Sequence, residues 1–194
     1  RGAVDWSIVR SMAPGLVAGS LVGPQIASAL PARTMAAVFT LFMWFTAFRM
    51  VRNAPPKPSR ELPGAAGLFG VGAGIGLLSG IVGAGGAFLS VPFMVRCNVR
   101  MHAAVATSAA LGLPIALAAT VGFVYAGLRK TGLPPYSVGY VYLPALAAFV
   151  AASMLSAPYG ARVAHSWDVA RLKRVFAVLM TALGGYMAWR AARG

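Results

Sequence analysis

The sequence predicts an all-α integral membrane protein: a multi-pass helical bundle with inverted repeats and one helical hairpin broken at glycines. Three observations predict this fold class. Of the 194 residues, 59% are hydrophobic and only 10% are charged, whereas about a quarter of the residues in a soluble domain are charged. Long stretches contain no charged residue, and glycines cluster inside the longest of them. Two parts of the chain also resemble each other.

Stretches without Asp, Glu, Lys or Arg alternate with short basic connections along the chain. About 20 apolar helical residues cross the hydrocarbon of a bilayer. Two of the stretches are shorter than that, but arginines at their ends can extend to the membrane interface. The pattern therefore predicts a long apolar segment over 64–96 and helices over 11–30, 34–51, 103–127, 138–163 and 174–190.

One linker divides the chain. Residues 52–63 contain four prolines and several charges, which a helix in lipid does not tolerate. Residues 1–51 are then the last helix pair of a first repeat, and residues 64–194 form a second repeat. The first helix pair resembles the pair 138–163 and 174–190 in its small, aromatic and Met residues. Chance similarity between apolar helices is the competing explanation.

The segment 64–96 is too long for one span, and its centre carries a glycine cluster. Gly83, Gly85 and Gly86 fall within four positions, and each glycine costs a helix about 1 kcal/mol relative to alanine. We therefore expect a break between helices 64–82 and 86–96. Backbone groups at such a break need protein, water or ligand partners. Amide groups at the start of the second helix would attract an anion.

The distribution of Lys and Arg indicates that the segment 64–96 returns to the side from which it starts. A hairpin puts 12 of the 17 basic residues on one face and 5 on the other, whereas a single crossing gives 10 and 7. Basic residues concentrate on the cytoplasmic face, so the hairpin is favoured and the richer face is expected to be cytoplasmic. The two helix pairs then point in opposite directions, as in transporters with inverted repeats.

Three further residues complete the candidate substrate-binding set with the glycine cluster. The hydroxyls of Thr107 and Ser108 either bond back to a carbonyl one turn earlier or contact a ligand. Pro92 removes a backbone donor and frees a carbonyl. Other glycines recur at helical spacing and are expected to pack helices closely. These are Gly70, Gly72, Gly74, Gly76 and Gly80.

The charge pattern also excludes classes of function. The net charge is +14, but the basic residues occupy separate connections rather than one patch, so no nucleic-acid partner is expected. The three acidic residues lie outside the apolar stretches, which disfavours cation transport and favours small anions or polar neutral solutes. Motifs of soluble enzymes are absent, and Cys97 is a single cysteine. No enzyme, catalytic residue, metal or cofactor is therefore expected.

Three motifs together resemble the signature of the sulfite exporter TauE/SafE family of bacterial membrane permeases. They are residues 76–92 (GLLSGIVGAGGAFLSVP), residues 104–108 (AVATS) and Gly127. Residues 4–6, Val-Asp-Trp, likewise resemble the start of that family's later helix pair. Members usually have a Gly-rich motif in each half. This chain has one only in its second half, so a member truncated at its N-terminus is expected. A separate difference is Ala87, which stands in place of the usual third clustered glycine.

The resemblance implies a multi-pass protein of the bacterial inner membrane. Its function would be secondary transport, often outward, of small anions such as sulfite, organosulfonates or related sulfur-containing or carboxylate anions. The lipid bilayer and the small anion are then its partners, and an oligomer is compatible with the pattern. Two alternatives are a passive channel for small solutes and a non-transporting membrane scaffold subunit.

Overall fold

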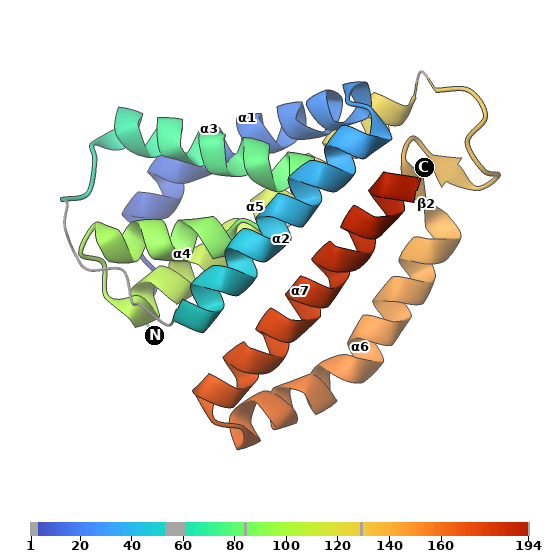
Figure 1. Cartoon of the computed structure of the whole chain (residues 1–194). Helices are drawn as coiled ribbons and strands as arrows, with labels where there is room; N and C mark the ends of the chain where they lie inside the picture. The colour runs from blue at the N-terminus through green and yellow to red at the C-terminus, as the bar shows by residue number, and fades with distance from the viewer. Residues whose placement is uncertain (1–3, 53–60, 84, 129, 194) are drawn as a thin grey trace. The chain divides into compact units, whose positions relative to one another are not determined.

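The computed structural model describes residues 4–52, 61–83, 85–128 and 130–193, over which the chain is predominantly helical (Figure 1). These residues form seven helices and one two-stranded sheet. The elements, in chain order, are α1 (Trp6–Ala29), α2 (Ala32–Arg52), α3 (Ala65–Val82), α4 (Ala87–Arg96), α5 (Met101–Gly127), β1 (Ser137–Val138), β2 (Val141–Tyr142), α6 (Leu143–Ser166) and α7 (Val169–Arg193).

The chain folds into two compact units that do not follow its linear order. One unit holds α1, α3, α4 and α5, and the other holds α2, the sheet, α6 and α7. The helix pair predicted over 11–30 and 34–51 is thus shared between the units. The predicted linker over 52–63 lies largely outside the described residues.

Close packing of α1 on α3 organises the first unit. The stripe of Gly72, Gly76 and Gly80 on α3 is buried against α1, as the spacing predicted. A Cβ atom built at Gly76 would overlap the carbonyl oxygen of Leu16, and one at Gly80 would lie 3.0 Å from Pro24 Cδ. The missing side chains therefore let the two backbones approach each other directly.

The matching surface of α1 is a second glycine stripe. Gly15, Gly19 and Gly23 are buried, and a Cβ atom on any of them would meet the backbone of α3. The expectation of packing is wrong for Gly70 and Gly74, which are exposed and have open space within 4 Å of a built Cβ atom. These two glycines lie on the side of α3 that faces away from α1.

The contacts of α1 show that α3 and α5 run in the same direction. Along α1, Gly15 approaches Phe69 and Gly23 approaches Gly80, so the numbering of α3 rises with that of α1. Likewise Asp5 contacts Thr107, and Gln25 contacts Gly122 on α5. Two consecutive long helices can be parallel only if the chain returns between them, and α4 runs back in Figure 1. The predicted hairpin is confirmed.

An apolar core joins the four helices of the first unit. Met12 and Leu16 of α1, Met94 of α4 and Leu111 of α5 have no exposed surface. They form one cluster with further side chains of the same helices and of α3. The half-length helix α4 is therefore anchored within the unit rather than lying on its surface.

In the second unit, α2 packs against α7, and the two helices run in opposite directions (Figure 1). Thr40 Oγ1 donates a hydrogen bond of 3.3 Å to the Gly184 carbonyl, and a Cβ atom at Gly184 would lie 2.8 Å from the Trp44 ring. Because Gly184 has no side chain, the indole ring of Trp44 on α2 can pack directly against the backbone of α7. By contrast, the window Leu143–Gly160 of α6 contains no buried residue.

Several predicted helix ends differ from the observed ones. The helix expected from residue 138 begins at Leu143, because residues 137–142 form a hairpin in which Ser137 pairs with Tyr142. Its two-residue turn begins at Gly139, whose φ of 58° suits glycine. The helices expected from residues 11 and 174 begin at Trp6 and Val169. The predicted ends differ because a stretch without charged residues shows only where a helix is apolar, whereas the helix itself can continue into sequence that contains charges.

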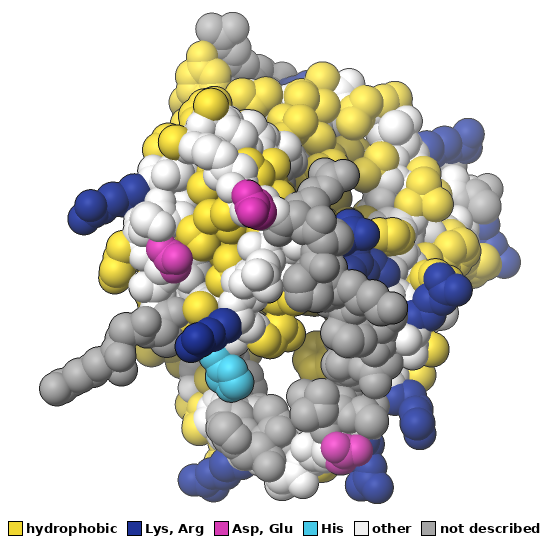
Figure 2. Space-filling model, turned by 90° about the vertical axis from the view of Figure 1, so that its left-hand side faces the viewer, with side chains coloured by type: hydrophobic (Ala, Val, Ile, Leu, Met, Phe, Trp, Pro, Cys, Tyr) yellow, Lys and Arg dark blue, Asp and Glu magenta, His cyan; other side chains and the backbone are white. Residues whose placement is uncertain are grey.

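Three described helical segments are long and apolar enough to cross a membrane: Ala65–Val82, Met101–Gly127 and Leu143–Gly160. The helices α1, α2 and α7 have sufficient length but carry arginines. Figure 2 shows apolar side chains over much of the visible surface, with Lys and Arg side chains projecting from it. Such large apolar surfaces are typical of proteins embedded in lipid.

Candidate functional site

The break between α3 and α4 occurs at the glycine cluster. Helix α3 ends at Val82, and Gly83 caps it with a left-handed backbone (φ 72°) and an N–H that donates to the Ser79 carbonyl over 2.8 Å. Helix α4 begins after Gly86. Gly83 and Gly85 are exposed, with open space within 4 Å of a built Cβ atom. The turn thus exposes bare backbone at these two positions.

The start of α4 lies at mid-height of the first unit. Gly86 is buried, and a Cβ atom on it would lie 2.6 Å from Ile115 Cδ1 and 3.5 Å from Ile75 Cγ2. Ile115 is near the centre of α5 (Met101–Gly127), and Ile75 is near the centre of α3. The chain has therefore turned back into the bundle before α4 begins. Only a residue without a side chain allows this approach without displacing Ile115.

Two buried serines fix α4 to α5. Ser90 Oγ donates to the Gly86 carbonyl over 2.9 Å, and the Oγ atoms of Ser90 and Ser108 are 2.8 Å apart. Ser90 and Ser108 are at most 1% exposed. Ser108 belongs to the site residues predicted from the sequence, whereas Ser90 does not, although its position one turn after Gly86 is a signal for such a bond.

Thr107 faces a different helix from its neighbour. Its Oγ1 atom accepts a hydrogen bond of 3.0 Å from the backbone N–H of Asp5, and the side chain is completely buried. Asp5 itself caps α1, because its carboxylate accepts from the N–H groups of Ser7 and Ile8. The Ser7 hydroxyl, which donates over 2.6 Å, is the main cause that lowers the pKa of the Asp5 carboxyl below its ordinary value of 3.8.

The six predicted site residues thus occupy four environments. Gly86 and Ser108 are brought together through Ser90, whereas Thr107 is directed toward α1. Gly83 and Gly85 lie at the open turn. Pro92 is half-buried inside α4 and leaves the Phe88 carbonyl without its helical donor.

Dipoles rather than charges characterise this break. No Lys, Arg, Asp or Glu occurs between residues 62 and 95. At the start of α4, Leu89 and Ser90 donate backbone hydrogen bonds to the Gly86 carbonyl, over 3.1 and 2.9 Å. N–H groups in the first turn of a helix carry partial positive charge. Among the described residues, no group of three His, Cys, Asp or Glu side chains could hold a metal ion.

Apolar spanning helices with a break at mid-height define the class of this chain as a multi-pass helical membrane protein. The family model for "Sulfite exporter TauE/SafE" matches residues 1–187, and the chain belongs to this family. The chain is also 26% identical over 181 residues to a "Probable membrane transporter protein" of Haemophilus influenzae, covering 92% of this chain and 68% of that relative. No solved structure matches the chain. The protein is therefore a membrane transporter.

Proposed function

We propose that the protein is a secondary transporter that exports small anions across the bacterial inner membrane. The substrate class is sulfite, organosulfonates or related sulfur-containing or carboxylate anions. The observation that carries this proposal is the position of Gly86, which puts the start of α4 beside the centre of α5. Substrate sites of transporters commonly lie near the bilayer midplane, at the ends of discontinuous helices.

The backbone at the break suits an anion that has lost its hydration shell. Gly85 is exposed, and the N–H groups that follow it begin a helix. Each hydrogen bond to a charged group contributes about 1.5–3 kcal/mol, so a few of them bind an anion reversibly. A carboxylate that would attract a cation is absent from residues 62–95. In this proposal the buried Ser90 and Ser108 position the start of α4.

Transport would require the site to face each side of the membrane in turn. We infer an inverted repeat from the similarity of α1 and α2 to α6 and α7, and such repeats support alternating access. The competing functions, a passive channel and a scaffold subunit, predict different fluxes. A carrier saturates and exchanges substrate, a channel conducts without saturating at low concentration, and a scaffold gives no flux.

The test is uptake of radiolabelled sulfite by proteoliposomes, measured against concentration for the wild type and for Gly85→Val. A Cβ atom at Gly85 would have open space within 4 Å, so the variant is expected to fold and to lose most of its uptake. Gly74→Val is the matched control, because Gly74 is equally exposed and open but lies within α3. Equal saturating uptake by all three proteins would reject the site, and absence of saturation would reject the carrier.

A further inference from the structure

Two arginines on the last turn of α2 lie over exposed aromatic rings. The guanidinium carbon of Arg49 is 5.8 Å from the centroid of the Phe45 ring, and that of Arg52 is 5.1 Å from the centroid of the Phe48 ring. The two rings are 53% and 57% exposed. Ring faces attract cations at such distances. The end of α2 therefore presents two positioned cations beside open apolar surface.

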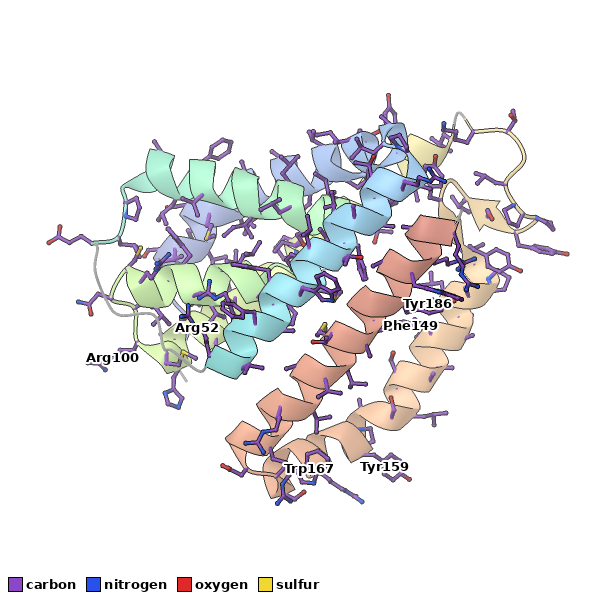
Figure 3. The ribbon with its side chains drawn as sticks, viewed as in Figure 1. Arg52, Arg100, Phe149, Tyr159, Trp167 and Tyr186 are labelled. Atoms are coloured by element: carbon purple, nitrogen blue, oxygen red, sulfur yellow. The ribbon has the colours of Figure 1, made fainter. Side chains whose placement is uncertain are left out.

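The first turns of α7 bring more positive charge to the same end of the second unit. Because α7 packs antiparallel to α2, its exposed Arg171 and Arg174 lie at the end where α2 finishes. Figure 3 shows Arg52 and Trp167 at this end of the pair. Asp168 is the one acidic residue that the sequence provides over 31–54 and 130–194. Four exposed arginines therefore share this end with one carboxylate.

Helix stability does not account for Arg171, which lies in the first turn of α7 (Val169–Arg193). Cations near a helix N-terminus are unfavourable, because the helix dipole is positive there. Arg190 and Arg193 at the other end of α7 agree with the dipole, and Arg193 lies 4.2 Å from the Trp189 ring centroid. An external anion at the start of α7 would convert the unfavourable charge of Arg171 into a favourable contact, and Arg174 lies close enough along the helix to contact the same anion.

We propose that this end of the α2–α7 pair binds the phosphate of an anionic phospholipid, whose acyl chains lie along α2. The exposed apolar surface of α2 favours a phospholipid over a phosphate compound that has no acyl chains. Leu41, Phe45 and Phe48 are each more than half exposed and have the i, i+4, i+7 spacing of one helix face. This face continues from the arginines toward the middle of α2. An acyl chain would cover it, and inorganic phosphate would leave it bare.

The test is the binding of short-chain phosphatidylglycerol to the purified full chain in neutral detergent, followed by native mass spectrometry. Zwitterionic phosphatidylcholine and inorganic phosphate are separate arms. Each basic residue near an anionic headgroup contributes about a factor of five, so Arg49→Gln with Arg52→Gln should weaken phosphatidylglycerol binding about 25-fold. The matched control is Arg33→Gln with Arg193→Gln, which removes the same charge at the other end of the pair and should change binding less than twofold.

Melting temperatures without added lipid check that both double variants fold. If Arg49→Gln with Arg52→Gln fails to fold, two other double variants replace it in the same titration. Arg49→Lys with Arg52→Lys keeps the charge, and Phe45→Ala with Phe48→Ala removes the two rings. The alanine variant should bind phosphatidylglycerol severalfold more weakly than the lysine variant. Equal binding of the two lipids, or equal weakening by the two arginine pairs, would overturn the proposal. Displacement of the lipid by inorganic phosphate at similar concentration would replace it with a free-phosphate site.

Discussion

The backbone N–H of Asp5 donates a hydrogen bond to Thr107 Oγ1, although the two residues are 102 positions apart in the chain. This bond joins the start of α1 to the first turns of α5. It also occupies the oxygen of a candidate substrate-binding residue. The hydroxyl group of Thr107 is thus already bonded within the protein, to the residue that caps α1.

Replacing Thr107 by Val should therefore lower stability more than it changes substrate affinity. The variant keeps the shape of the side chain but leaves the Asp5 N–H without its acceptor, at a cost of about 1–3 kcal/mol. Thr107→Ser retains the oxygen and should melt close to the wild type. Thermal melting in detergent and sulfite uptake measure the two effects. A tenfold loss of affinity at unchanged melting temperature would instead assign Thr107 to the substrate.

The contact between α1 and α3 should not tolerate any side chain. A Cβ atom at Gly19 would overlap the Ala73 carbonyl and lie 2.6 Å from the Leu77 nitrogen. Because backbone cannot move aside as a flexible side chain does, we expect Gly19→Val to destabilise the protein by about 3 kcal/mol or more. Gly70→Val, at an exposed and open position of α3, is the control and should melt like the wild type. A stable Gly19→Val protein would contradict the observed helix packing.

Acid should weaken the cap of α1. The folded state lowers the pKa of Asp5 below 3.8, so its ionised carboxylate stabilises the fold above that pH. This contribution decreases as pH falls through the lowered pKa. Asp5→Ala removes the cap and should cost about 0.5–2 kcal/mol near neutral pH. Asp5→Asn still caps but does not titrate. Below pH 3.8, the melting temperature of this variant should therefore fall less steeply with pH than that of the wild type.

The orientation of the first unit can be read from two engineered cysteines in a Cys97→Ser background. Glu61 is exposed just before α3, and Leu128 is exposed just after α5, so they lie at opposite ends of two parallel helices. The excess of basic residues predicts that the start of α3 is cytoplasmic. A membrane-impermeant thiol reagent should then label Leu128→Cys in intact cells and Glu61→Cys only after permeabilisation. The reverse labelling would invert the assignment.

The sequence by itself determined where the helix breaks. Gly83, Gly85 and Gly86 disfavour a helix through their own backbone freedom, which depends on no distant residue. The break accordingly falls between Val82 and Ala87, as predicted. The sequence also determined the hairpin, since the positions of Lys and Arg restrict which connections can share a membrane face.

Only the tertiary structure decided which residues meet. Ser90 pairs with Ser108, Thr107 with Asp5, and Gly86 packs against Ile115. Each contact depends on how closely two helices approach, and the approach of α4 to α5 depends on Gly86, where a side chain would meet Ile115. The sequence pattern identified the stripe on α3 but not its partner on α1. Local propensity acts over a few residues, whereas these contacts are set by the packing of whole helices.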